Sequence, residues 1–317
     1  MAAAVANSIT LELLDKAVTL GRAAARDGRP ASYIPELARA DPASVGIAVC
    51  DTNGEVLTAG DAHVPFTLQS VSKVFALACV LRSHDDELWQ HVSMEPSGDA
   101  FHSIVRLEEE NGRPRNPLIN AGAIVVSDRL HGEGPVERIA GFREFLCAAS
   151  GKPCTDERFA LNERVYQSEC RTGFRNRALA NYMRHYAVVS DPETAIDTYF
   201  RQCSLEVSAA ELSRVGLMLT AGGIDPATGR RLLASTASRK VVALMATCGL
   251  YDEVGRFAVE VGLPAKSGVS GAILAIVPGR YSVACFGPAL GARGNSLAGI
   301  EMLRVLSGEL GLSLYGE

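Results

Sequence analysis

The sequence lacks the cysteine and histidine patterns that bind metal ions. Its eight cysteines and six histidines form no Cys-x-x-Cys and no His-x-x-x-His pair, the spacings typical of zinc sites. In a chain of 317 residues, cysteines scattered singly through apolar segments indicate reduced, buried thiols rather than a disulfide framework. We therefore expect no metal ion and a cytoplasmic location.

Long apolar runs and an excess of positive charge are also missing. No run approaches the roughly 20 apolar residues of a membrane span, and Glu12, Asp15 and Lys16 interrupt the apolar start of the chain before a signal peptide could form. A formal net charge of -5 gives no basic surface for nucleic acid or anionic lipid. We expect neither a nucleic-acid nor a membrane partner, and a small-molecule substrate is the default.

Three common enzyme signatures are absent as well. The sequence contains no G-x-S-x-G, no G-x-G-x-x-G and no P-loop, which excludes the usual serine-hydrolase elbow, dinucleotide-binding and nucleotide-phosphate motifs. What is present is an ordinary globular composition, with 47% apolar and 21% charged residues. A chain of this length and composition can bury a sizeable core.

Periodicity places helices and strands in a distinctive order. Helical spacing predicts a helix over residues 9–26, and two short apolar runs at 44–50 and 55–59 flank Asn53-Gly54, a strong hairpin signal. Helical patterns dominate residues 84–250. We expect further strands at Arg256 to Val261, Gly271 to Val277 and Tyr281 to Gly287, and a last helix from about 295 to 308.

This order predicts an α+β fold. Strands from the two ends of the chain would form one antiparallel sheet, flanked by the terminal helices, and a large helical subdomain would lie beside it. We expect a single domain over residues 1–317, with one subdomain made of 1–69 and 251–317 and the other of 70–250. A site is expected where the two subdomains meet.

The segment Ser70-Val71-Ser72-Lys73 places a hydroxyl and an amine one helical turn apart. At this spacing two side chains share one face of a helix, so an unprotonated lysine could take the proton of the serine. Apolar residues 74–81 follow and predict a buried helix. Ser70 would lie at its first turn, where unpaired backbone N–H groups favour negative charge. The alternative is an exposed Ser and Lys on an ordinary helix.

A second segment, Lys266-Ser267-Gly268, precedes the strand predicted near Gly271. The pairing of S-x-x-K with a later K-S-G is found in penicillin-binding proteins and serine β-lactamases and predicts a fold of that β-lactamase/transpeptidase type. In such a site the serine attacks an amide carbonyl, and the second segment supplies backbone donors and positive charge beside the substrate. The middle S-x-N or Y-x-N motif of those enzymes is absent here.

Further motifs follow the order found in the serine-dependent glutaminases. They are Tyr33-Ile34-Pro35-Glu36-Leu37, Glu95-Pro96-Ser97-Gly98-Asp99, Asn116-Pro117-Leu118-Ile119-Asn120-Ala121-Gly122-Ala123-Ile124, Ser168-Glu169 with Arg175-Asn176, Cys248-Gly249-Leu250-Tyr251-Asp252, and Gly262 to Val269. The chain resembles the compact bacterial-type members of that family over nearly its whole length. One departure is Ser270, where relatives often have a second glycine.

The resemblance implies hydrolysis of L-glutamine to L-glutamate and ammonia, without metal or organic cofactor, by a homodimer or homotetramer. It makes Ser70 the nucleophile and Lys73 the general base, with an oxyanion hole from the backbone N–H groups of Ser70 and Val269. A proton relay would be Tyr199 or Tyr251. The implied substrate contacts are Tyr33, Ser70, Asn120, Glu169, Asn176, Tyr199, Tyr251 and Val269. A carboxylate suits the α-ammonium group of glutamine, and amide and hydroxyl donors suit its α-carboxylate.

Each of these residues could also have a purely structural role, and the function has rivals. Asn120 could cap a helix, Glu169 could form a solvated ion pair with Arg175, Asn176 could be surface, Tyr199 could be core, and Lys266 could be a strand-end lysine. The rival functions are a β-lactamase or peptidase of the same architecture and a catalytically silent amino-acid sensor. An intact Ser and Lys pair favours an enzyme, since a binding module has no need of a nucleophile with a base.

Overall fold

The computed structural model describes residues 9–83, 85–97 and 104–316. Its centre is a five-stranded sheet, and every pairing in it is antiparallel. The strand order is β2-β1-β7-β6-β5, so strands from the two ends of the chain share one sheet, as the sequence predicts. The strands are β1 (Gly46–Asp51), β2 (Val56–Gly60), β5 (Ala265–Ser267), β6 (Ala272–Val277) and β7 (Tyr281–Phe286).

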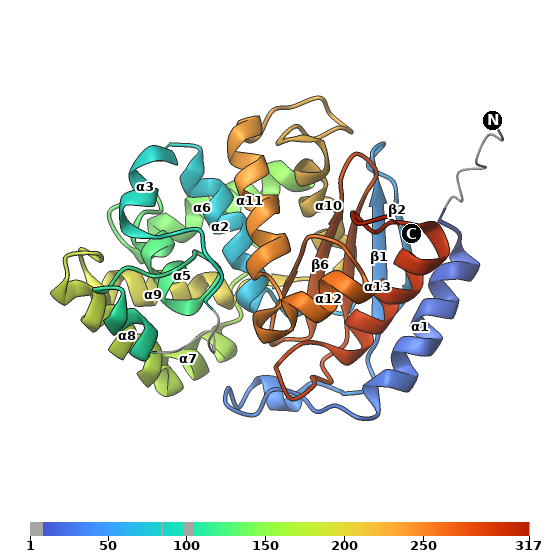
Figure 1. Ribbon diagram of the computed structural model, residues 1–317, viewed down its shortest axis with the longest axis horizontal. Helices are drawn as coiled ribbons and strands as arrows, with labels where there is room; N and C mark the ends of the chain where they lie inside the picture. Colours follow the sequence, from blue (N-terminus) through green and yellow to red (C-terminus); the bar gives the residue numbers. More distant parts are fainter. Residues whose placement is uncertain (1–8, 84, 98–103, 317) are drawn as a thin grey trace.

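The terminal helices cover one face of this sheet. Helices α1 (Leu11–Ala25) and α13 (Leu297–Leu310) lie side by side along the right of the molecule (Figure 1). Successive side chains of a strand point to opposite faces, so Ile47 and Val49 join the core beneath these helices, whereas Ala48 joins the larger core on the other side. The alternation of β1 thus separates the two cores.

The other face carries the helical part of the chain, which extends to the left in Figure 1. Helix α10 (Ala209–Gly216) lies directly on β1 and β7. The helices around it are α2 (Ser72–Leu81), α3 (Asp85–His91), α4 (Ile104–Glu109), α5 (Asn120–Asp128), α6 (Pro135–Ser150), α7 (Glu163–Thr172), α8 (Phe174–His185), α9 (Pro192–Cys203) and α11 (Ser235–Cys248). The helical part also contains a two-stranded sheet and short 3-10 turns. The two strands of this sheet are β3 (Phe66–Thr67) and β4 (Glu206–Val207).

The strand expected at Arg256 to Val261 was wrong, because this segment is helix α12 (Val254–Glu260). Its apolar residues alternate, which favours a strand from sequence alone. In the helix, however, Phe257 and Val261 lie four residues apart and are both buried, while Val259 is 89% exposed. An ion pair of 2.7 Å between Arg256 Nε and Glu260 Oε1 bridges one turn of the exposed face.

The two motif segments also differ in detail from expectation. Lys266-Ser267-Gly268 precedes strand β6 as expected, but Lys266 and Ser267 also belong to a further strand, the edge strand β5, whose three residues are too few to show an alternating pattern. Ser70 lies in a 3-10 turn, η2 (Gln69–Val71), which runs directly into the buried helix α2. Of the family-like motifs, Gly98 and Asp99 fall outside the described residues. Within the described ranges, no helix is both long and apolar enough to cross a bilayer.

Candidate active site

A cavity of about 410 Å³ opens beside Ser70, where turn η2 meets the helical part of the chain. Its walls come from the segment before the first strand, from η2, and from helices α5, α7, α8 and α9. Six residues singled out from the sequence line it together: Tyr33, Ser70, Asn120, Glu169, Asn176 and Tyr199. Their separation along the chain is large, and the fold brings them to one place.

The position of Ser70 depends on a close approach of two backbone segments. A Cβ atom at Gly268 would lie 3.1 Å from the carbonyl oxygen of Leu68, tighter than most such contacts, so glycine lets the chain after strand β5 pass this near to the turn that carries Ser70 without displacing it. Hydrogen bonds from Gly268 N to Ala272 O and from Gly271 N to Gly268 O hold the turn that follows. Val269 is therefore fixed next to the N-terminal end of the Ser70 helix.

Lys73 is buried one turn beyond Ser70. Its Nζ lies 2.7 Å from Asn120 Oδ1 and 3.3 Å from the carbonyl oxygen of Leu118. Burial lowers the pKa of Lys73 to about 8, against the opposing effects of Cys203 and Glu169. A neutral amine has two N–H donors and one lone pair, and both donors have acceptors here. Neither contact uses the lone pair of the neutral amine, which could accept a proton.

Asn120, Asn176 and Tyr199 form a hydrogen-bonded group on one wall of the cavity. Asn120 Nδ2 donates to Asn176 Oδ1 at 3.0 Å, and the Tyr199 hydroxyl donates to Asn120 Oδ1 at 3.4 Å. The N-cap of helix α5 is Ile119, so the side chain of Asn120 serves the cavity rather than the helix end. Tyr199 is buried, yet it lines the cavity.

Glu169 lies on helix α7 and is buried rather than solvated. Burial raises its pKa to about 7, while a hydrogen bond from the Gln69 side chain and the charge of Lys73 lower it. A buried carboxylate of this kind favours a cationic partner, because its charge is poorly solvated. The alternative of an exposed ion pair with Arg175 does not describe this side chain.

Gln69 is a cavity residue that the sequence did not reveal. It has a positive φ of 46°, a left-handed conformation that costs a residue with a Cβ about 1–2 kcal/mol. Besides Glu169, its side chain amide reaches the carbonyl oxygen of Cys203 and Thr67 Oγ1, both at 3.4 Å. Backbone strain of this kind persists only where surrounding contacts hold it, and it clusters at functional sites. The only signal in the sequence was its place directly before Ser70.

Tyr251 contacts Ser70 but does not line the cavity. Its hydroxyl donates to the carbonyl oxygen of Ser267 at 3.1 Å. Burial raises the pKa of Tyr251, and a hydrogen bond with the Ser70 side chain opposes that rise. Tyr251 also has a positive φ of 52°, so its backbone is strained like that of Gln69.

Lys266 holds the segment on which Tyr251 lies. Its Nζ donates to the carbonyl oxygens of Gly249 at 3.1 Å and Ser267 at 2.7 Å, and it stands 4.4 Å from the centre of the Tyr251 ring. Full burial, followed by repulsion from Lys73, lowers its pKa well below the usual value. The amine thus ties strand β5 to the Tyr251 turn.

Tyr33 lies at the mouth of the cavity and is 57% exposed. Desolvation of its hydroxyl, with smaller contributions from Tyr251 and Glu169, raises its pKa well above the usual value. Tyr33 therefore stays neutral and can donate a hydrogen bond at the entrance. In the part of the chain that is described, no three His, Cys, Asp or Glu side chains are grouped to hold a metal ion.

Comparisons with known proteins agree on one family. The glutaminase family model matches residues 28–315. A glutaminase of Rhodopseudomonas palustris is 48% identical over 91% of this chain and 92% of its own length, and a glutaminase of Sinorhizobium fredii is 46% identical over 92% and 91%. The structure of a Bacillus subtilis glutaminase in covalent complex with 5-oxo-L-norleucine, formed by reaction with 6-diazo-5-oxo-L-norleucine, is 32% identical. It superposes with a TM-score of 0.86 over 96% of this chain and 99% of that one.

Proposed function

This chain belongs to the glutaminase family, with an α+β fold of the β-lactamase type, and we propose that it hydrolyses L-glutamine to L-glutamate and ammonia through an acyl-enzyme on Ser70. One observation carries the mechanism: both N–H donors that a neutral Lys73 would have are matched by acceptors, Asn120 Oδ1 and Leu118 O. The lone pair of that amine is left to act as the general base.

In acylation, Lys73 Nζ takes the proton from Ser70 Oγ as the oxygen attacks the side-chain amide carbon of glutamine. The negative charge that develops on the carbonyl oxygen would be stabilised by the backbone N–H groups of Ser70 and Val269, and the close approach of Gly268 to the Ser70 turn supports this assignment. The proton then passes to the amide nitrogen, the C–N bond breaks, and ammonia leaves. The product on the enzyme is a γ-glutamyl ester of Ser70.

Tyr251 is the better candidate for passing the proton to the leaving group. It is hydrogen-bonded to Ser70 and held by Ser267 O and the Lys266 amine. The hydroxyl of Tyr199 instead points to Asn120, which suits a role in binding. In deacylation a water molecule attacks the ester, the same groups return a proton to Ser70 Oγ, and glutamate departs.

The remaining cavity residues fit the amino-acid end of glutamine. Glu169 would bind the α-ammonium group, since its buried carboxylate gains from a cationic partner. The amides of Asn120 and Asn176 and the hydroxyls of Tyr33 and Tyr199 would bind the α-carboxylate. A substrate that lacks either charged group leaves buried polar atoms unpaired, which accounts for selection of a free amino acid over a peptide.

The test is ammonia release by the purified protein. We expect release from L-glutamine with equimolar L-glutamate, and much slower release from L-asparagine, whose amide would fall short of Ser70 when its amino-acid end is bound. Added hydroxylamine should divert the acyl-enzyme to γ-glutamyl hydroxamate. No ammonia from glutamine would overturn the proposal in favour of a silent sensor, and a stable adduct of Ser70 with a labelled penicillin would favour the β-lactamase or peptidase.

We further propose that the enzyme acts in the cytoplasm as a homodimer or homotetramer, without nucleic-acid or membrane partners. This rests on the resemblance and on the net charge of -5. Light scattering of the purified protein tests the assembly, and a monomer at micromolar concentration would contradict it.

A further inference from the structure

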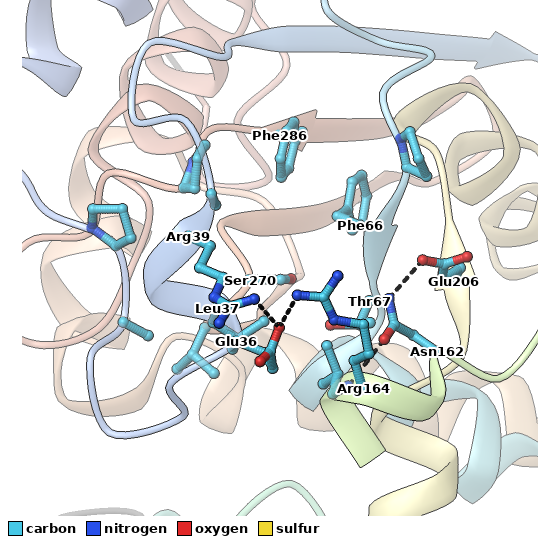
Figure 2. Close-up of a pocket in the computed structure, with 17 residues that line it drawn as sticks. Glu36, Leu37, Arg39, Phe66, Thr67, Asn162, Arg164, Glu206, Ser270 and Phe286 are labelled. Carbon is cyan, nitrogen blue, oxygen red and sulfur yellow. Dashed lines mark hydrogen bonds and ion pairs between the residues drawn. The ribbon is translucent and has the colours of Figure 1, made fainter. Parts of the chain in front are cut away.

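A second cavity, of about 360 Å³, is shown in Figure 2. Residues 30–40 and helix α7 contribute to both cavities. In the second cavity, the segment after Tyr33 contributes Glu36 and Arg39, the start of α7 contributes Asn162 and Arg164, and the turn after β5 contributes Val269 and Ser270. Strand β3 and the end of β7 close the remaining side.

The polar end of this cavity is built around one carboxylate. Arg39 Nη1 lies 3.3 Å and Arg164 Nη2 lies 3.0 Å from the same oxygen, Oε2 of Glu36, and Figure 2 shows the two guanidinium groups converging on it. Each guanidinium carries five N–H donors and contacts Glu36 through a single nitrogen. The arginine side chains are 65% and 70% exposed, so they are open to a further anion.

Positive charge exceeds negative charge at this end, since two guanidinium groups meet one carboxylate. The other acid that lines the cavity, Glu206, stands apart in Figure 2 and accepts a hydrogen bond of 2.8 Å from Asn162 Nδ2. Planar guanidinium groups recognise carboxylates preferentially, by paired hydrogen bonds. Glu36 already shows that a carboxylate fits between them.

The other end of the cavity is apolar. The rings of Phe66 and Phe286 stack with centroids 4.6 Å apart and planes within 10°, and they lie across the cavity from the Glu36 cluster in Figure 2. Between the two ends is Ser270, which is buried and whose Oγ has no hydrogen-bond partner among the described residues.

We propose that this cavity binds a small organic carboxylate with an apolar body. The carboxylate lies on Arg39 and Arg164, the apolar body lies against Phe66 and Phe286, and Ser270 Oγ supplies a hydrogen bond at the wall between them.

Occupancy of this cavity is transmitted to the active site through a shared wall. Ile34, Leu37, Val165 and Val269 belong to one small hydrophobic cluster, against which Tyr251 packs. Ile34 lines the first cavity, and the other three line the second. Arg164 also lies on α7, the helix that carries Glu169. This coupling rests on the proposed function, whereas the binding site does not.

Binding is tested with 3-phenylpropionate as the probe and 3-phenylpropanol as its uncharged counterpart, by isothermal titration calorimetry on the full chain. We expect saturable binding of the acid and at least about threefold weaker binding of the alcohol. Arg39→Gln and Arg164→Gln should each raise the dissociation constant of 3-phenylpropionate about threefold to fivefold, the size expected for an exposed charge pair. Glu36→Gln should strengthen binding of 3-phenylpropionate, because this variant removes the carboxylate that competes for the two arginines.

Two control variants test whether the probe binds in this cavity and nowhere else. Arg304→Gln removes an exposed arginine that is paired with Glu301 on α13, and it should leave binding unchanged. Asn176→Ala alters the first cavity and should also leave binding unchanged. No saturable binding at millimolar probe, equal binding of the alcohol, or binding that is insensitive to Arg164→Gln and Glu36→Gln would overturn the site.

The coupling is tested on glutamine turnover. Saturating 3-phenylpropionate should change the KM for glutamine. The probe should also change the dissociation constant of glutamate, and glutamate should change the dissociation constant of the probe by the same factor, because linkage is reciprocal. Both effects should be reduced in Arg164→Gln. Probe binding with no change in KM, kcat or glutamate affinity would overturn the coupling. A protein that binds the probe but releases no ammonia would refute the proposed function and leave the site intact.

Discussion

The Nζ of Lys73 lies 2.7 Å from Oδ1 of Asn120. The same Asn120 donates to Asn176 and accepts from Tyr199, so the amine proposed as the base is positioned by the amide group proposed to hold the substrate carboxylate. Binding and proton transfer therefore share one hydrogen-bonded group. This arrangement leads us to expect that disturbance of the amino-acid pocket also alters the base.

The pH dependence of kcat/KM should reflect two groups. In the proposed mechanism, Lys73, with a pKa lowered to about 8, acts only when neutral, and Glu169, with a pKa raised to about 7, binds the α-ammonium group only when ionised. Both groups lose a proton to become competent, so kcat/KM should rise with pH from about 6 to about 8.5. Steady-state assays across this range measure it. A profile that falls from about pH 7 upward would refute both assignments.

Replacing Glu169 should weaken binding more than it slows chemistry. Glu169→Gln removes the charge that faces the α-ammonium group, and we expect the KM for glutamine to rise about tenfold to a hundredfold with a smaller fall in kcat. The pH profile of kcat/KM should lose the ionisation near pH 7 that belongs to Glu169 and keep the ionisation of Lys73. Glu163→Gln, at the exposed start of the same helix, is the control. An equal rise in KM in this variant would contradict the role proposed for Glu169.

Gln69 offers a matched pair of variants. Gln69→Gly and Gln69→Ala both delete the hydrogen bond to Glu169, so both should raise KM and raise the pKa of that carboxyl. Only glycine relieves the positive φ of 46°, and Gln69→Gly should be more stable than Gln69→Ala by about 1 kcal/mol. Chemical denaturation measures the difference. An alanine variant as stable as the glycine one would show that this backbone carries no strain.

The two tyrosines should respond differently to loss of the hydroxyl. Tyr251→Phe removes the group that is hydrogen-bonded to Ser70 and Ser267, and we expect kcat to fall about a hundredfold to a thousandfold, as for loss of a proton-transfer group. Tyr199→Phe removes a 3.4 Å hydrogen bond to Asn120. We expect it to lower kcat/KM about threefold to tenfold, mainly through a higher KM. The reverse order would make Tyr199 the relay.

The sequence predicted the sheet and the motif residues because the signals for them lie among residues that are close together in the chain. Two short apolar runs and Asn53-Gly54 predict β1 and β2, which pair in the structure as expected, and the apolar run after Lys73 becomes the buried helix α2. Periodicity was insufficient at Arg256 to Val261, where the alternation of Phe257 and Val259 resembled a strand. The burial of Phe257 with Val261 decides for a helix, and burial depends on tertiary packing.

The missed parts of the site depend on long-range contacts. The strain and hydrogen bonds of Gln69 follow from α7 and α9 reaching the Ser70 turn, which no spacing in the sequence records. The placement of Lys266 against Gly249 and the Tyr251 ring requires the short β5 edge strand. The second cavity likewise joins residues from separate stretches of chain.

The most direct test of the account is ammonia release from L-glutamine by Ser70→Ala beside the wild-type protein. Ser70 supplies the nucleophilic oxygen of the proposed acylation and carries the acyl group that water then removes, so the rate should fall at least about a thousandfold, with the fold retained by circular dichroism. No γ-glutamyl hydroxamate should form when hydroxylamine is added. A Ser70→Ala protein that releases ammonia within about tenfold of the wild-type rate would contradict the acyl-enzyme mechanism.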